Sequence, residues 1–211
     1  MKPQDQTHDD DEEEQQSQFS PYSEFEVETY RALLKDRTIL YNGVIDKSVV
    51  ERIVLPLTRL GRSNKPIKLL LNSPGGSVED GQIVVDAILT CKAQVTTVAL
   101  GQAMSAAFDI FLAGDKRVVY PNTILMMHSG SSRFEYQTLP QIITESDLHK
   151  RYFDRWSIWY ASRTNIPKND WYKMLNTGLN YYYFPEEALS MGLVHEVIKP
   201  VSKNVKRKQS R

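Results

Sequence analysis

The sequence predicts an α/β fold with a largely parallel sheet. Short apolar runs of strand-like composition alternate with longer stretches in which apolar residues recur at helical spacing. Two of the predicted strands stop at turns that contain glycine and serine, and a helical stretch follows each turn. Strands that alternate with helices in this way usually pair in parallel, because each intervening helix carries the chain back to the start of the sheet.

The first half of the chain begins with a short amphipathic helix and a strand. Asp46 is predicted to be the N-cap of the next helix, in which apolar residues recur at spacings of three and four. An apolar strand then runs into an Asn-Ser-Pro-Gly-Gly turn, and a further helix follows it. The corresponding ranges are 30–34, 38–41, 46–60, 67–71 and 78–88.

The second half repeats the strand and helix pattern. An apolar strand leads into an apolar helix, a second strand ends at a histidine, and a long helix follows a polar loop. A short helix near Glu186 and a terminal strand complete the predicted domain. The corresponding ranges are 95–100, 103–112, 124–127, 139–163 and 193–198.

Composition indicates a soluble, cytoplasmic protein with a single domain between two tails. Hydrophobic residues make up 41 % of the 211 residues, and the formal net charge is +0, which gives no reason to expect a nucleic acid or a membrane as partner. The single cysteine, Cys91, suits a reducing compartment. We expect a disordered acidic tail at 1–20, a domain at 21–201 and a basic tail at 202–211.

Three short motifs at the ends of strands carry residues suited to acyl transfer. The Pro-Gly-Gly turn ending at Gly76 can bring bare backbone N–H groups close to a substrate. Ser105 lies where a strand gives way to a helix, so that the helix N-terminus favours negative charge beside its hydroxyl. His128 ends an apolar strand. Each motif alone is typical of an ordinary turn, cap or core residue, but their joint occurrence favours a catalytic site.

The order of these motifs resembles that of the Clp protease proteolytic subunit. The sequence contains Asn-Ser-Pro-Gly-Gly, then Gly-Gln-Ala-Met-Ser, then Met-Met-His, and the similarity extends from about Tyr30 to Ile198. The resemblance implies the ClpP/crotonase-like fold, with stacked right-handed ββα units and a protruding handle helix at 139–163. It also implies self-association into heptameric rings, stacked as a tetradecamer.

The resemblance implies a serine endopeptidase that hydrolyses unfolded polypeptides inside an oligomeric chamber. Ser105 would be the nucleophile and His128 the general base, and the N–H groups of Gly76 and Ala106 would form the oxyanion hole. No cofactor or metal is expected for this hydrolysis. A separate AAA+ unfoldase would supply the polypeptide.

The chain departs from the family pattern at several positions. Asn180 stands where the family has the third catalytic residue, an aspartate, and an asparagine can orient His128 but cannot stabilise the imidazolium by charge. Asn176 and Asp170 are weaker candidates for this role. Lys68 and Leu70 replace aromatic residues of the unfoldase docking site, so we expect altered docking. The segment 131–135 lacks the usual glycines, which indicates a changed specificity.

Two other functions remain open from the sequence. Asn180 would suit a weakly active or inactive subunit that acts structurally in a mixed Clp complex. The same fold also serves phage-type maturation proteases and crotonase-like acyl-CoA enzymes, although a serine and histidine pair is unsuited to acyl-CoA chemistry.

Overall fold

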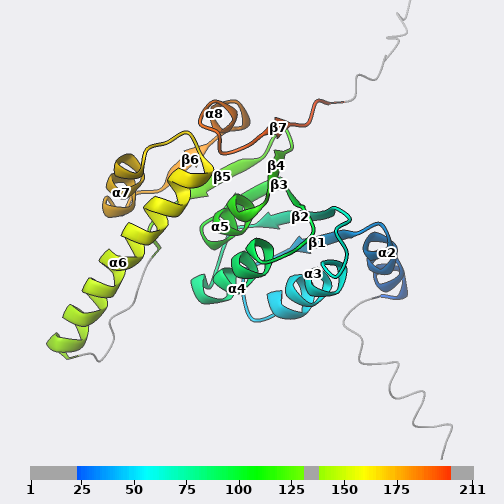
Figure 1. Cartoon of the computed structure of the whole chain (residues 1–211), viewed down its shortest axis with the longest axis horizontal. Coiled ribbons are helices and arrows are strands. Elements are labelled where there is room, and N and C mark those ends of the chain that lie inside the picture. The colour runs from blue at the N-terminus through cyan, green and yellow to red at the C-terminus, as the bar shows by residue number, and fades with distance from the viewer. Residues whose placement is uncertain (1–22, 131–137, 201–211) are drawn as a thin grey trace, which may run out of the picture.

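A computed structural model describes residues 23–130 and 138–200 of the chain (Figure 1). The tails expected at 1–20 and 202–211, and the segment at 131–135, lie outside the described residues.

The described chain alternates strands and helices, as the sequence predicts. The strands are β1 (Thr38–Asn42), β2 (Ile67–Ser73), β3 (Val95–Met104), β4 (Lys116–Val119), β5 (Ile124–Met127), β6 (Tyr181–Tyr183) and β7 (Glu196–Val197). The helices are α2 (Glu24–Lys35), the π-helical turn η2 (Val50–Val54), α3 (Leu55–Leu60), α4 (Val78–Leu89), α5 (Ala106–Ala113), α6 (Leu139–Arg163), α7 (Lys168–Asn176) and α8 (Pro185–Ser190).

The strands form one sheet in the order β1-β2-β3-β4-β7, and all of these neighbours are parallel. The first half of β3 pairs with β4, while its second half pairs in parallel with β5. Strand β6 adds to β5 in the antiparallel direction. The sheet therefore divides along β3, and the ends of β3 and β5 lie side by side.

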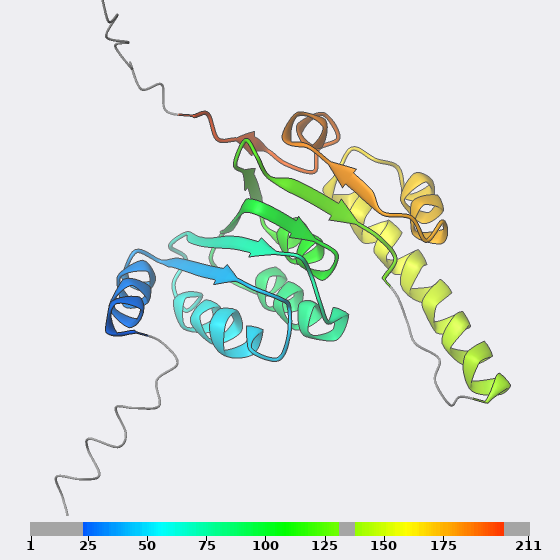
Figure 2. The ribbon, with the colours of Figure 1, turned by 180° about the vertical axis from the view of Figure 1, so that it is seen from behind.

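Helices α3, α4 and α5 cover one face of the sheet (Figures 1 and 2). Every residue of α5 is buried, which is typical of a helix in the middle of a core rather than on a surface. Its Phe108 packs with Tyr160, Trp171 and Tyr183, from α6, α7 and β6. The nucleophile predicted from the sequence thus precedes the most enclosed helix of the described chain.

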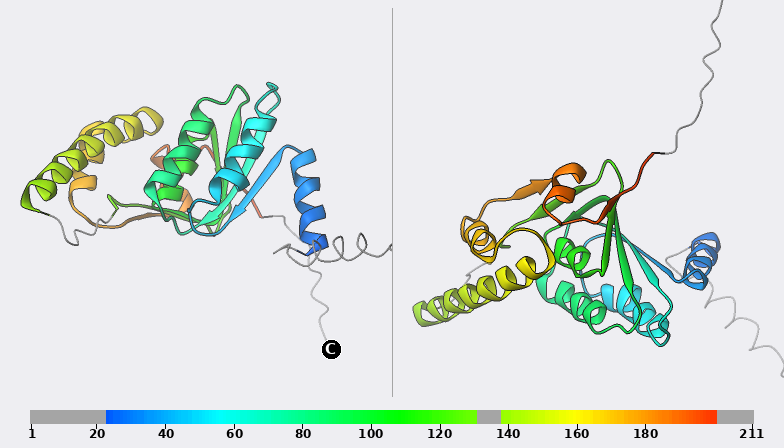
Figure 3. Two further views of the ribbon diagram at one scale, coloured as in Figure 1. Left: turned by 90° about the horizontal axis from the view of Figure 1, so that it is seen from below. Right: turned by 45° about the horizontal axis from the view of Figure 1, so that its top comes forward.

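Helix α6 is 25 residues long and projects away from the sheet and its helices, as expected for the handle (Figure 3). Its buried residues, Ser157 and Tyr160, lie toward its C-terminal end. Leu139 and Ile143, near its N-terminal end, are 76 % and 62 % exposed, so this end lacks apolar partners within the described chain.

The structure corrects several of the predicted boundaries. Strand β3 continues to Met104 and α5 begins at Ala106, so the predicted helix at 103–112 started too early. The helix predicted from Asp46 begins later, because the π-helical turn η2 starts at Val50 with Val49 as its N-cap residue, and Asp46 accepts hydrogen bonds from the amide and hydroxyl of Ser48 in the turn before it. The terminal strand is limited to β7. Strands β4 and β6 and helix α7 have no counterpart among the predicted elements. The two strands have only four and three residues, which is too few for a clear periodic signal.

Candidate active site

Two neighbouring parallel strands bring Ser105 and His128 to the same edge of the sheet. Met104, at the end of β3, pairs with Met126 of β5, and the amide of Ser105 donates to the Met126 carbonyl at 2.9 Å. Ser105 directly follows β3 and His128 directly follows β5. Because parallel strands end at a common edge, the two side chains come together although the sequence separates them widely.

Ser105 has an unusual backbone conformation for a serine. Its φ is 53° and its ψ is −128°, at the sharp turn between β3 and α5. A residue with a Cβ adopts positive φ at a cost of about 1–3 kcal/mol, which the surrounding structure must supply. The turn directs the serine side chain out of the enclosed core helix and toward the strand edge.

The hydroxyl of Ser105 and the ring of His128 form a short hydrogen bond. Nε2 of His128 lies 2.7 Å from Oγ of Ser105. Partial burial lowers the pKa of His128 below its ordinary value, because desolvation disfavours the charged ring. A neutral histidine at this distance can accept the hydroxyl proton.

The turn after β2 approaches Ser105 closely through two glycines. A Cβ on Gly75, whose φ is 98°, would lie 2.5 Å from Cβ of Ser105, and one on Gly76, whose φ is 150°, would lie 2.2 Å from the carbonyl oxygen of Ile45. Neither position has room for a side chain, which explains the two glycines of the motif.

The structure leaves two backbone amides beside Ser105 available as donors. Ala106 is the first residue of α5, where an amide has no partner within its helix. Within the described ranges, the N–H groups of Gly76 and Ala106 donate to no other group. These are the two amides that the sequence suggested for an oxyanion hole.

Asn72 contributes to the site in a way that the sequence analysis missed. The pairing of β2 with β3 is irregular between Leu71 and Ser73, and the Asn72 side chain fills this break. Its Oδ1 accepts from the amide of Gln102 at 3.2 Å, and its Nδ2 donates to Asn42 at 2.7 Å. These bonds hold the end of β2 to its two neighbouring strands just before the glycine turn. The asparagine in the motif was the available signal.

The pairing of β5 with β6 brings Asn180 near His128, but the two side chains are not hydrogen-bonded to each other. Tyr181, the first residue of β6, pairs with Met127, so Asn180 and His128 each lie one residue beyond this pair. Asn180 is exposed, and its Nδ2 contacts the hydroxyl of Tyr182 at 3.4 Å. In the described part of the chain, no hydrogen bond reaches Nδ1 of His128.

The weaker candidates for the third position are engaged elsewhere on α7. Asp170 forms an ion pair with Lys173 at 3.3 Å, and Asn176 donates to the carbonyl of Tyr172 at 3.0 Å. The structure joins neither residue to His128 by a hydrogen bond.

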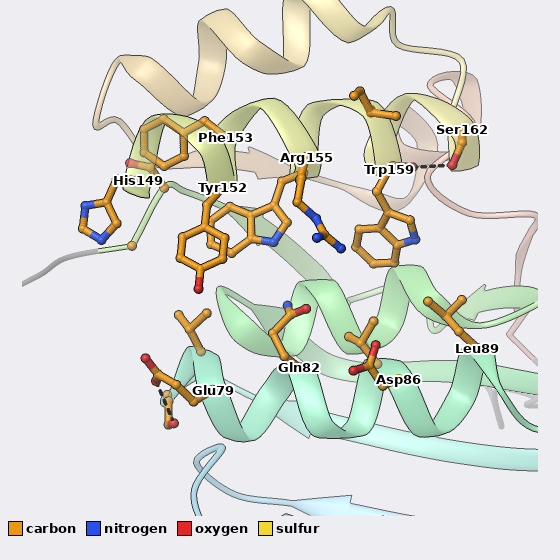
Figure 4. Close-up of a pocket in the computed structure, with 18 residues that line it drawn as sticks. Glu79, Gln82, Asp86, Leu89, His149, Tyr152, Phe153, Arg155, Trp159 and Ser162 are labelled. Carbon is orange, nitrogen blue, oxygen red and sulfur yellow. Dashed lines mark hydrogen bonds between the residues drawn. The ribbon is translucent and has the colours of Figure 1, made fainter. Parts of the chain in front are cut away.

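A groove of about 900 Å³ lies between α4 and α6, and one end of it adjoins the site. Gly76 and Gly130 border this end: Gly76 follows Gly75, which approaches Ser105, and Gly130 lies two residues after His128. Figure 4 shows the side chains of the two helices facing each other across the groove. Tyr152, Phe153 and Trp159 line it from α6, and charged groups at Glu79, Asp86 and Arg155 also border it.

The fold and the site define a class of protein. A serine hydroxyl bonded to a histidine, with unpaired amides beside it at the edge of a parallel sheet, is the arrangement found in serine hydrolases. Within residues 23–130 and 138–200, no three His, Cys, Asp or Glu side chains group as a metal site, and no helix is long and apolar enough to span a membrane.

Comparisons with known proteins identify the family within this class. The Clp protease family matches residues 22–201. The ATP-dependent Clp protease proteolytic subunit of Deinococcus radiodurans is 32 % identical over 179 residues, which cover 83 % of this chain and 86 % of the relative. A solved structure of an Asn-to-Asp mutant of ClpP1 from Listeria monocytogenes matches with a TM-score of 0.72 and 30 % identity, covering 82 % of this chain and 97 % of that chain.

The chain belongs to the Clp protease family, and it is a serine endopeptidase of the Clp type. The similarity to the solved ClpP1 structure confirms the fold class predicted from the sequence. The predicted family and the predicted enzyme class are confirmed as well.

Proposed function

We propose that Ser105 attacks the peptide carbonyl and that His128 is its general base. The 2.7 Å contact between Oγ of Ser105 and Nε2 of His128 is the observation that carries this proposal. His128 takes the hydroxyl proton as the serine oxygen bonds to the carbonyl carbon, and then gives it to the leaving amine. Water hydrolyses the resulting ester by the same steps, which regenerates the serine.

The N–H groups of Gly76 and Ala106 stabilise the oxyanion in this proposal. Both amides are free of other acceptors in the described chain, and they come from the two segments that enclose Ser105. Donors that are fixed before the reaction stabilise the developing charge without any cost of reorganisation at that moment.

Asn180 is the proposed third member of the site. Its position one residue beyond the pair of Met127 and Tyr181 supports this role. A rotation of its side chain away from Tyr182 would let its Oδ1 accept from Nδ1 of His128. An amide in this place fixes the ring orientation but leaves the imidazolium without a compensating charge.

The substrates proposed for this site are unfolded polypeptides, cleaved inside a chamber that the chain forms with its own copies. The exposed apolar residues at the N-terminal end of α6 support self-association, which we propose yields heptameric rings stacked as a tetradecamer in the cytoplasm. A AAA+ unfoldase would deliver substrates. Lys68 is exposed and Leu70 half-buried on β2, so its docking surface would differ from the usual aromatic one. No nucleic acid or membrane is proposed as partner.

Labelling with a fluorophosphonate, mapped by mass spectrometry, tests the proposed nucleophile. We expect Ser105 to be modified in the wild type, unmodified in Ser105→Ala, and modified far more slowly in His128→Ala. Ser190→Ala is the control, because this hydroxyl only donates to the carbonyl of Glu187 on α8. An assembled wild type with an unmodified Ser105 would contradict the proposal.

The comparisons do not favour the alternative functions considered from the sequence. An inactive structural subunit would have no need of the close contact between Ser105 and His128, which this chain keeps.

A further inference from the structure

A buried carboxyl group lies in the helix that follows the proposed nucleophile. Asp109 is on α5, one helical turn after Ser105, and only 7 % of its surface is exposed. All other residues of this helix are apolar and buried. A carboxyl group is costly to bury, so its presence in this helix calls for a partner and a reason.

The partner of Asp109 is a tyrosine on the handle helix. The hydroxyl of Tyr160 donates to Oδ1 of Asp109 at 2.5 Å, and Tyr160 is itself 2 % exposed. Burial raises the pKa of Asp109 to about 7, while the hydrogen bond from Tyr160 opposes this rise. A hydrogen bond to a carboxylate in such a dry environment is among the stronger ones in proteins.

The same end of α6 holds α5 at a second point. Arg163, one turn after Tyr160, donates from its guanidinium to the carbonyls of Leu112, Ala113 and Gly114. These carbonyls belong to the C-terminal end of α5, where a cation also suits the helix dipole. Tyr160 therefore fixes α5 near its middle and Arg163 fixes its end, so the handle controls how α5 is placed along and about its axis.

The surroundings of this pair also reach the strands that carry His128. Phe108, next to Asp109, stacks on Tyr183 of β6 with ring centroids 6.4 Å apart, and β6 pairs with β5. His128 directly follows β5. The Tyr183 hydroxyl is buried and has no hydrogen-bond partner among the described residues, so it does not link β6 to α5 or α6 by a hydrogen bond.

We infer that Asp109 and Tyr160 are positioning residues for the proposed nucleophile. Their hydrogen bond anchors α5 to the handle and so holds Ser105, at the head of α5, within reach of His128. The inference rests on the proposed function. It assigns the pair no contact with substrate, only control over the geometry of the 2.7 Å contact between serine and histidine.

Single-atom changes test the inference with a matched control. Tyr160→Phe removes a hydroxyl that holds α5, whereas Tyr183→Phe removes a buried hydroxyl that holds nothing. In assembled protein we expect Tyr160→Phe to lower kcat for a short fluorogenic peptide by about 10-fold to 100-fold, because small displacements of reacting groups are costly. KM should change little. Tyr183→Phe should keep both constants.

Asp109→Asn and the double variant complete the test. Because the two side chains act as one unit, the double variant should lose no more activity than the more affected single variant. The rate of Ser105 modification by a fluorophosphonate should fall in parallel with kcat. Additive losses in the double variant, or an equal fall in Tyr183→Phe, would show a general effect of core disruption and overturn the inference.

The outcomes separate this inference from the proposed function. A wild type that neither cleaves the peptide nor reacts at Ser105 contradicts the proposed function. A wild type that does both, together with a Tyr160→Phe variant of equal kcat, contradicts the positioning role alone.

Discussion

The two halves of the proposed catalytic group differ in how firmly the fold holds them. Ser105 and His128 follow paired parallel strands, and their side chains meet at 2.7 Å. Asn180 precedes a strand of only three residues, is exposed, and contacts Tyr182 rather than His128. The pairing of β3 with β5 thus fixes the positions of the nucleophile and the base. No hydrogen bond in the described chain holds the Asn180 side chain against His128.

This difference suggests where the activity of the chain can be adjusted. A preformed serine and histidine contact requires no partner, whereas the orientation of Asn180 can change when neighbouring surfaces are covered. Leu179, which precedes it, and Tyr182, two residues after it, are 60 % and 54 % exposed. Burial of these residues in an assembly would restrict the side chain of Asn180.

Removing the side chain of Ser105 or His128 should have the largest effect on activity. In Ser105→Ala or His128→Ala we expect kcat to fall by about 10⁶-fold, because the two residues act as one unit in acyl transfer. Peptide hydrolysis in assembled protein measures the loss, with Ser190→Ala as the unaffected control. A loss below tenfold in either variant would place the reaction at another group.

Crowding the nucleophile from the adjacent turn should have the next largest effect. In Gly75→Ala the new Cβ would lie 2.5 Å from Cβ of Ser105 and 2.6 Å from the Met104 carbonyl, which must displace the serine. We expect kcat to fall by about 100-fold. Thermal unfolding should show a loss of about 1–3 kcal/mol, since alanine at a φ of 98° is also strained.

Gly178→Ala separates the steric clash from the backbone strain. Gly178 also has a positive φ, 68°, but a Cβ there would meet nothing within 4 Å. It should lose about 1–2 kcal/mol of stability by strain alone and keep its kcat. Equal losses of kcat in both variants would refute the importance of the close approach at Gly75.

Replacing Asn180 by a residue with a carboxylate should raise activity. In Asn180→Asp a carboxylate can stabilise the His128 imidazolium, and we expect kcat to rise by about 10-fold to 100-fold, a part of the effect known for a triad carboxylate. Asn180→Ala should lower kcat, because it removes the side chain that we propose orients the His128 ring. An unchanged kcat in Asn180→Ala would show that the asparagine does not orient the histidine.

The pH dependence of kcat/KM tests, with the smallest expected effect, whether residue 180 acts on His128. Burial lowers the pKa of His128, and only the neutral ring is a base, so kcat/KM should fall as the pH drops through a value below 6.5. In Asn180→Asp the new negative charge favours the protonated ring. The acidic limb of the profile should therefore move to higher pH. An unmoved limb would mean that residue 180 does not face His128.

Much of the fold and half of the site followed from sequence patterns. The apolar strand runs, the helical spacing of 139–163 and the glycines of the turn each have a local cause that the sequence displays. The boundary at Ser105 was missed, because the residues from Ala103 to Ala107 suit a strand end and a helix start equally well. Strand β6 was missed because three tyrosines carry no periodic signal.

The sequence by itself determined the family, the α/β alternation and the residue types that acyl transfer requires, since these depend on composition and order along the chain. Only the tertiary structure decided that Ser105 and His128 meet while Asn180 turns away, and that Asp109 finds its partner on the handle. These contacts join segments far apart in sequence. Their geometry depends on strand register and on packing between elements, which no local pattern encodes.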